Sequence, residues 1–283
     1  MKTKIAITTD SAADIEKSFA KEYDIHIIPM VILSGESQFK DGIDITPVRM
    51  LEKYEETKSA PKATAVSAQE YKLVFSSLIE KGFDVVHICP SGKLFPCYEN
   101  ACFAANAFEN VHVIDSQSVS AGLMLLCLEA SRMRLEEKSA DEIVSGVEAL
   151  KAQIETSFLA ADAQLLYKSG LCTALEKTGS SLFGFYPTVD ITDGAITVGE
   201  KQRGSRDIAR TKFRDRKLEA LGDGGSECVL LSVCGLDQKQ IDELRAYIKE
   251  ISCAKYVTVS EAGCCMASYC SDGFIGLAFK REL

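Results

Sequence analysis

The chain has 283 residues, 46% of them hydrophobic and 26% charged, which is typical of a globular protein with a sizeable core. Its length favours two domains over one. The net charge of -9 argues against a nucleic-acid partner, because no excess of Lys and Arg is present to neutralise phosphates. The longest apolar runs, such as 123–128, are too short to cross a membrane. With no secretory signal sequence, we expect a cytoplasmic, reduced protein.

In chain order, the first half alternates short apolar runs with segments of helical periodicity. Strands are predicted at 4–8, 25–33, 85–89 and 111–114, and helices at 13–22, 46–57, 68–81, 94–105, 118–135 and 140–154. Residues 58–67 are predicted to form a loop. Thr46 before Pro47 is a good helix start, since the Thr side chain accepts from a free N–H group of the first turn and Pro has no N–H that would need a partner.

The second half alternates in the same way after about Glu155. Residues 158–160 are predicted as a strand, 163–168 and 174–178 as short helices, and 185–190 with 195–201 as a hairpin around Asp193-Gly194. A helix at 205–221, a strand-helix-strand unit over 228–259, a helix at 261–268 and a strand at 274–279 follow. We therefore predict an α/β protein of two α/β domains, 1–155 and 156–283, the first with a mainly parallel sheet.

The unit from 84 to 122 shows where a ligand would bind. Its two strands end in Ser91 and in Asp115-Ser116, and the first strand of the chain ends near Asp10-Ser11. Open α/β sheets bind ligands at the carboxyl edge of their strands. The hydroxyls there are helix caps or, alternatively, a cradle of neutral donors for an anionic headgroup, because a buried anion needs several hydrogen bonds.

Motifs for common catalytic chemistry are absent from the sequence. There is no G-x-S-x-G, G-x-G-x-x-G or phosphate-binding loop. His26, His87 and His112 each lie in an apolar, strand-like run, where a histidine is typically a structural residue with a satisfied hydrogen bond. Cys264, Cys265 and Cys270 lack the paired spacing of a zinc site. We expect no catalytic residue, no metal and no cofactor.

Several motifs along nearly the whole chain together resemble the DegV family of bacterial fatty-acid-binding proteins. The segments Thr9–Asp14, Asp41–Thr46 and Val113–Ser116, the last with Ser118 and Gly122, are similar to family motifs in order and spacing. So are the later segments Tyr167–Gly170, Asp193-Gly194, Arg203-Gly204 and Gly276–Phe279. The resemblance implies a two-domain protein that holds a long-chain fatty acid in an apolar tunnel between its domains. It further implies that the acyl carboxylate is presented to a separate ATP-dependent kinase subunit.

The chain departs from the family pattern at motif positions that the resemblance places near the headgroup of the ligand. The family's T-S-Q-P-S begins here with Ala63, its L-S-G-T is Leu94-Phe95-Pro96-Cys97, and its C-terminal histidine falls on Tyr269. The family's G-G-R-I is 169–172 without the arginine. Tyrosine donates one hydrogen bond but, unlike imidazole, carries no charge near neutral pH.

From the resemblance we assign ligand binding to Thr64, Ser91, Gly92, Phe95, Ser116, Arg203 and Tyr269. Three alternatives stay open. The ligand is a fatty acid or another lipid, the chain is an enzyme that uses the edge formed by Asp10, Ser11, Ser91 and Asp115 on a small acyl or phosphorylated substrate, or it is an interaction module with a closed tunnel.

Overall fold

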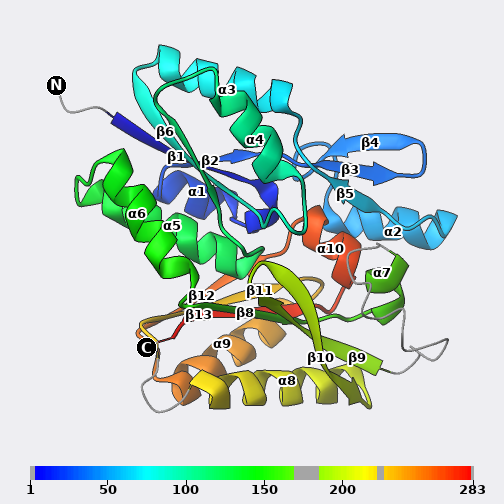
Figure 1. Ribbon diagram of the computed structural model, residues 1–283. Helices are drawn as coiled ribbons and strands as arrows, with labels where there is room; N and C mark the ends of the chain where they lie inside the picture. Colours follow the sequence, from blue (N-terminus) through cyan, green and yellow to red (C-terminus); the bar gives the residue numbers. More distant parts are fainter. Residues whose placement is uncertain (1–3, 169–184, 222–225, 282–283) are drawn as a thin grey trace.

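The computed structural model describes residues 4–168, 185–221 and 226–281, which form three sheets with helices around and between them (Figure 1). A four-stranded parallel sheet builds the N-terminal half, and a six-stranded mixed sheet builds the C-terminal half. A small three-stranded antiparallel sheet lies beside the first. The predicted α/β class and the parallel N-terminal sheet are confirmed.

The N-terminal sheet has the strand order β2-β1-β6-β7. Its residues alternate between two cores: Val85 faces α3 and α4, whereas Val86 faces α5 and α6. A strand covered on both faces reads as a continuous apolar run, which explains its sequence. The bounds are β1 (Lys4–Asp10), β2 (Ile25–Ile28), β6 (Phe83–Cys89), β7 (Val111–Asp115), α1 (Lys17–Glu22), α3 (Ala68–Glu80), α4 (Cys97–Ala105), α5 (Ala121–Leu135) and α6 (Ala140–Lys151).

The C-terminal sheet has the strand order β10-β9-β8-β13-β11-β12. Helices α8 and α9 pack against one another and against its strands, as Figure 1 shows below the sheet. The bounds are β8 (Ile154–Leu159), β9 (Phe185–Thr192), β10 (Ala195–Arg203), β11 (Cys228–Val233), β12 (Tyr256–Glu261), β13 (Ile275–Lys280), α7 (Ala163–Lys168), α8 (Arg206–Leu221), α9 (Gln238–Ser252) and α10 (Cys264–Cys270). This sheet begins at Ile154, beside the predicted domain boundary at 155.

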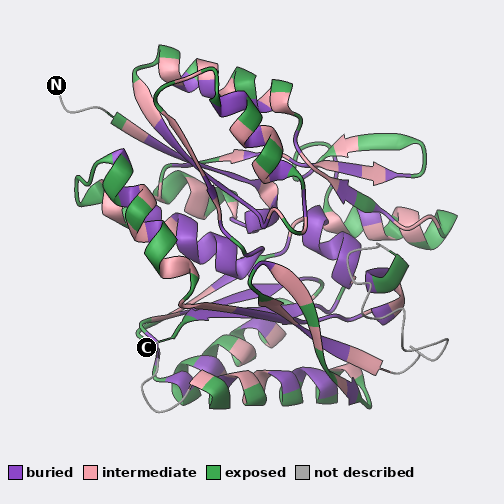
Figure 2. Ribbon diagram, viewed as in Figure 1, coloured by how far each residue is buried: buried purple, intermediate pink, exposed green. Residues whose placement is uncertain are grey.

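Helix α5 joins the two halves. It packs against β1 and β6 of the N-terminal sheet and against β8, β11 and β13 of the other sheet. Its residues from Ala121 to Cys127 are all buried, which Figure 2 shows as a purple helix between the layers. A helix that is apolar all round has to be covered on every side. The two halves therefore share a core through α5.

Three predicted elements differ from the structure. The single strand at 25–33 is wrong: Pro29, which lacks an N–H, separates β2 from β3 (Val31–Ser34), and β3 pairs with β4 (Ser37–Lys40) and β5 (Lys62–Thr64) instead. The predicted loop at 58–67 thus contains β5, and α2 (Pro47–Thr57) begins after Thr46 as expected. The helix at 13–22 breaks at Asp14, whose φ of 52° leaves a 3-10 turn (Ser11–Ala13) and α1.

The remaining boundaries shift by a few residues. The helix predicted from 94 begins at Cys97, and that predicted from 118 begins at Ala121, because the preceding residues form hydrogen-bonded turns. The helix predicted at 174–178 and the motif residues 169–172 lie outside the described residues. Among the described residues, no helix combines the length and hydrophobicity needed to span a bilayer.

Candidate functional site between the two halves

Ser91 follows the end of β6 by two residues and is fully buried. Its hydroxyl donates a hydrogen bond of 2.6 Å to the carbonyl oxygen of Gly194, which belongs to the other half of the chain. Its backbone N–H donates to the carbonyl of Ser118, at 2.8 Å. The predicted ligand donor is therefore occupied by a contact between the halves in this conformation.

The contact to Ser91 comes from the tip of the β9–β10 hairpin. Asp193 and Gly194 both have positive φ, of 50° and 78°, as a two-residue hairpin turn requires. A Cβ at Gly194 would lie 2.6 Å from the Ser91 hydroxyl oxygen, so only glycine permits this approach. The sequence predicted the turn, but its position over Ser91 follows from the tertiary structure.

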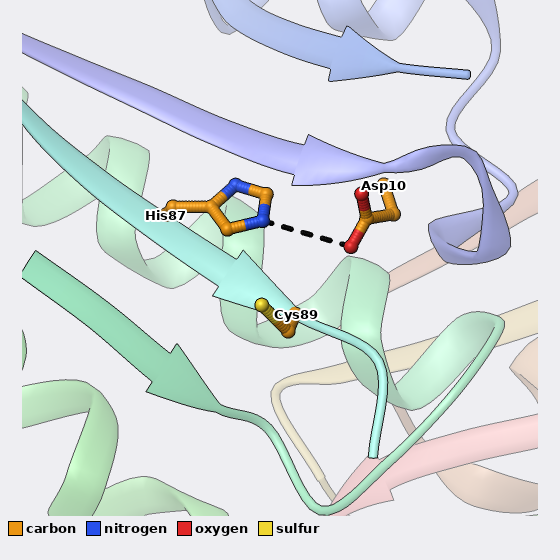
Figure 3. A group of neighbouring side chains, drawn as sticks. All are labelled: Asp10, His87 and Cys89. Carbon is orange, nitrogen blue, oxygen red and sulfur yellow. Dashed lines mark ion pairs between the residues drawn. The ribbon is translucent and has the colours of Figure 1, made fainter. Parts of the chain in front are cut away.

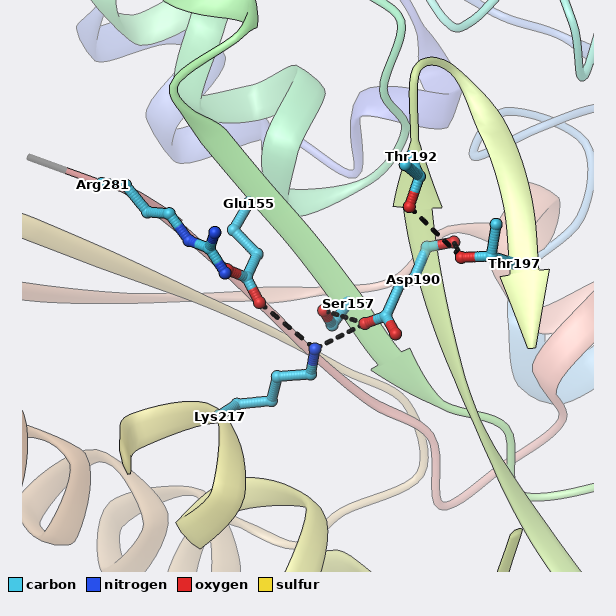
Figure 4. A network of polar contacts seen from close by, with 7 residues as sticks. All are labelled: Glu155, Ser157, Asp190, Thr192, Thr197, Lys217 and Arg281. Carbon is cyan, nitrogen blue, oxygen red and sulfur yellow. Dashed lines mark hydrogen bonds and ion pairs between the residues drawn. The ribbon is translucent and has the colours of Figure 1, made fainter. Parts of the chain in front are cut away.

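A charged network holds β9 close to the tip of this hairpin (Figure 4). The Lys217 ammonium on α8 donates to Asp190 of β9 at 2.5 Å and to Glu155 of β8 at 3.2 Å. Ser157 also donates to Asp190, and Arg281 forms an ion pair with Glu155. The side chains of Lys217, Glu155 and Asp190 are mostly buried, so the attraction between their charges is screened less than at the surface, whereas Arg281 is more exposed. The network fixes β8, β9 and α8 to one another and thereby supports the hairpin.

Gly92 and Ser116 lie beside Ser91 but make internal contacts. The N–H of Gly92 donates to the Asp115 carboxylate at 3.2 Å, and the N–H of Gln117 donates to the same oxygen at 2.9 Å. The hydroxyl of Ser116 donates to the carbonyl of Ser118 and accepts from its N–H. In this conformation these groups stabilise turns, which is the structural alternative to binding a headgroup.

Three of the four departures from the family pattern converge in space, and the fourth, at 169–172, lies outside the described residues. The Tyr269 hydroxyl of α10 donates to the carbonyl of Ala63 at 3.3 Å, and the Tyr269 ring lies 6.0 Å from the ring of Phe95. All three residues are buried. Burial raises the pKa of Tyr269 above its ordinary value of 10, so this side chain is a neutral donor. The sequence showed three separate substitutions, and the structure shows one continuous cluster.

An apolar cavity adjoins Phe95 and Tyr269. Its volume is about 10 Å³, roughly the space that one water molecule needs. Side chains from both halves enclose it: Leu94, Phe95, Val119, Phe158, Leu166, Ile196, Met266 and Tyr269. Its lining includes Leu94, which follows Ser91 closely in the chain, and Ile196, which follows the hairpin tip, so the cavity lies near the contact between Ser91 and Gly194.

Thr64 adjoins this cluster through Ala63 but has another hydrogen-bond partner, whereas Arg203 lies apart from the cluster. Thr64, at the end of β5, donates its hydroxyl to the carbonyl of Val31 at 3.2 Å. Arg203 is exposed at the far end of the nine-residue strand β10, with its guanidinium 4.5 Å from the centre of the Phe185 ring. At ~3.3 Å per residue, Arg203 lies roughly 25 Å along the strand from the hairpin tip. The structure does not bring Arg203 to Ser91.

The acidic residues of the N-terminal motifs have a role that the sequence analysis missed. Asp41 accepts hydrogen bonds from the N–H groups of Cys264 and Cys265, and Asp14 accepts one from the N–H of Gly263. These N–H groups begin α10, which belongs to the C-terminal half. Asp41 also accepts from the Ser11 hydroxyl, so this predicted edge hydroxyl is a structural contact. The sequence feature that pointed to this role is that the motifs Thr9–Asp14 and Asp41–Thr46 contain acidic residues but no Lys or Arg.

One group of described side chains has the composition of a metal site. Asp10, His87 and Cys89 place a carboxylate oxygen, a ring nitrogen and a sulfur within 4.8 Å of one another. All three are fully buried, so Asp10 is not part of an open catalytic edge with Ser91.

Comparison with known proteins gives the family of the chain. A family model described as an uncharacterised protein of the DegV family matches residues 4–282. The chain belongs to the DegV family. A DegV domain-containing protein of Caldanaerobacter subterraneus is 28% identical over 284 residues, which cover 99% of each chain.

Solved structures share the fold of this DegV chain. A stearic acid-binding protein from Eubacterium ventriosum has a TM-score of 0.86 at 23% identity, covering 98% of each chain. The Streptococcus pneumoniae fatty acid kinase B3 protein, loaded with linoleic acid, has a TM-score of 0.84 at 19% identity and covers 99% of this chain and 100% of its own. At these identities the likeness establishes the two-domain fold of the chain.

Proposed function

We propose that this DegV protein binds a long-chain fatty acid or a related lipid between its two halves and presents the headgroup to a separate kinase. The observation that carries the proposal is the apolar cavity between the halves, which borders the loop that follows Ser91. Similar folds are described as binding stearic acid and linoleic acid, the latter in a fatty acid kinase protein. The family membership supports the same function.

The cavity has to expand for this function. A volume of about 10 Å³ is far below the roughly 300–1,000 Å³ of typical ligand pockets. In this conformation Phe95 is buried at the wall of the cavity, and the Ser91 hydroxyl is bonded to Gly194. Outward movement of the β9–β10 hairpin would break the hydrogen bond between Ser91 and Gly194. That movement would open the cavity and free the Ser91 hydroxyl for a headgroup at the same time.

The energetics allow such an opening. Burial of about 14 methylene groups at ~0.8 kcal/mol each supplies on the order of 11 kcal/mol before the costs of binding. The loss of one hydrogen bond between Ser91 and Gly194 costs about 1 kcal/mol when the headgroup replaces it. The acyl chain therefore contributes most of the affinity, and Ser91 with Tyr269 orients the headgroup. These two side chains are neutral donors, which suits a carboxylate or a neutral polar headgroup.

A second candidate function is an interaction module whose cavity stays closed. The small cavity volume and the contact between Phe95 and Tyr269 favour it. The two candidates differ in one property, which is whether an acyl chain enters the protein.

Lipid extraction and mass spectrometry of the purified protein distinguish these candidates. We expect one co-purified acyl chain per protein, or saturable binding of added stearic or oleic acid measured by displacement of a fluorescent fatty acid. Phe95→Ala should bind oleic acid more tightly, because it enlarges the cavity, whereas Phe213→Ala, in another core cluster, should not. A wild-type protein and a Phe95→Ala variant that are both empty and both fail to bind would refute lipid binding.

Presentation to a kinase has a separate test. The lipid-loaded protein is mixed with a bacterial fatty acid kinase and ATP, and acyl phosphate is measured. Product that depends on this protein supports presentation, whereas binding without any product restricts the function to lipid binding.

A further inference from the structure

A buried group of three potential metal ligands lies in the N-terminal half (Figure 3). Asp10 ends β1, and His87 and Cys89 lie on the neighbouring strand β6. The parallel register pairs Thr9 with Ile88, which places Asp10 next to Cys89. His87 and Cys89 are two residues apart, so their side chains leave the same face of the strand. Neither Asp10 nor His87 nor Cys89 lines the cavity described above.

Two atoms of this group have no hydrogen-bond partner although they are buried. They are Oδ2 of Asp10 and Nε2 of His87, which face each other at 3.6 Å. That distance is too long for a hydrogen bond between nitrogen and oxygen. A buried polar atom without a partner costs about 1–3 kcal/mol, and more if it is charged. The two atoms therefore point to a group that binds between them.

The remaining atoms of Asp10 and His87 are held in the way that metal ligands usually are. The Tyr71 hydroxyl donates to Oδ1 of Asp10 at 2.7 Å, and the Thr8 hydroxyl lies 2.8 Å from Nδ1 of His87. When Nδ1 carries the proton of the ring, Nε2 keeps a free lone pair that faces Asp10. Outer contacts of this type fix the ring orientation and the tautomer of a ligating histidine. The edges of the Tyr71 and Phe75 rings against His87 keep water away.

The charges also favour a divalent cation. A divalent cation bound to one carboxylate, one thiolate and one neutral imidazole gives a net charge of zero. Because the group as a whole is then neutral, the free-energy cost of burying its charges away from water is reduced.

We propose that Asp10, His87 and Cys89 bind Zn²⁺ through Oδ2, Nε2 and Sγ. Zinc prefers tetrahedral sites with these ligand atoms, and bond lengths near 2.0 Å would place the oxygen and nitrogen about 3.3 Å apart. The 3.6 Å between them requires only a small adjustment. On binding, the Cys89 thiol becomes a thiolate and releases its proton to solvent, while His87 stays neutral. The metal joins the end of β1 to β6 and stabilises the N-terminal half.

Metal analysis of the full chain tests this proposal. The protein is unfolded with a chelator, refolded without metal, and titrated with Co²⁺ and then with Zn²⁺. We expect one equivalent of Co²⁺ to give thiolate charge-transfer and tetrahedral absorption bands, and one equivalent of Zn²⁺ to remove them. Zn²⁺ should also raise the Tm of the refolded protein.

Variants locate the site. Cys89→Ser and His87→Gln should lose the Co²⁺ bands, and Tyr71→Phe should weaken Zn²⁺ binding about 10–100-fold, since outer contacts tune affinity to that extent. Cys234→Ala, a buried thiol in the C-terminal half, is the matched control and should keep the bands. The wild-type spectrum decides the matter even where a variant fails to fold. Refolded wild-type protein without thiolate bands and without a Zn²⁺-dependent Tm would overturn the proposal and leave a proton between Asp10 and His87.

Discussion

Asp14 lies between the two halves of the chain, and its titration makes the stability of the protein depend on pH. Its carboxylate is buried and accepts from the Ser120 hydroxyl at 2.5 Å, the Gly263 N–H at 2.8 Å and the Ser232 hydroxyl at 3.4 Å. Desolvation raises the pKa of Asp14 from its ordinary value of 3.8 to about 7, although the bonds from Ser120 and Gly263 oppose that change. The native state therefore binds a proton more tightly than the unfolded chain does.

This difference in pKa sets the sign and the size of the effect. Below pH 4 the carboxyl is protonated in both states, and the stabilising contribution of the bound proton is complete. As pH rises from about 4 to about 7, the unfolded chain loses its proton first, so the free energy of unfolding falls. One pKa unit corresponds to about 1.4 kcal/mol, and the whole decrease is on the order of 4 kcal/mol.

Asp14→Asn removes this titration, because the amide is neutral at every pH. We expect the free energy of unfolding of the variant, relative to wild type, to rise by a few kcal/mol between pH 4.5 and 7.5. Urea unfolding at several pH values measures the difference, and Asp242→Asn, an exposed carboxylate on α9, controls for the loss of a charge. A difference between Asp14→Asn and wild type that does not change with pH would refute the reasoning.

Three further substitutions test contacts on which the site depends. Ser91→Ala should destabilise the protein by about 1–3 kcal/mol in urea unfolding, because the buried carbonyl of Gly194 loses its donor; equal stability would show that this contact is not maintained in solution. Gly122→Ala should cost about 1–3 kcal/mol or prevent folding, since the new Cβ would collide with the side chain of Thr156; an unchanged Tm would contradict this close packing. Lys217→Met should lower the Tm and increase proteolysis near the β9–β10 hairpin, because the partly buried Asp190 loses its cation and Glu155 keeps only Arg281; unchanged proteolysis would argue that the network does not hold the hairpin.

The sequence was sufficient for features that depend on neighbouring residues. Apolar runs such as 85–89 predicted buried parallel strands, and Asp193-Gly194 predicted a two-residue turn, because each depends on local backbone and side-chain preferences. The helix predicted at 140–154 begins at Ala140 as α6, because Ser139 and Glu142 form both hydrogen bonds of a capping box. The strand at 25–33 failed because an apolar run does not show that its two parts pair with different sheets.

Only the tertiary structure decided which distant residues meet. Ala63 and Tyr269 are 206 positions apart and share a hydrogen bond, and Ser91 reaches Gly194 over 103 positions. The sequence named Ser91 and Tyr269 as ligand contacts but could not show that internal partners already occupy both. His87 was expected to be a strand residue with a satisfied hydrogen bond, and its Nδ1 has one with Thr8, but the sequence could not show that its Nε2 is buried without a partner. Such contacts follow from how sheets and helices pack, and this packing depends on the whole chain rather than on any local segment.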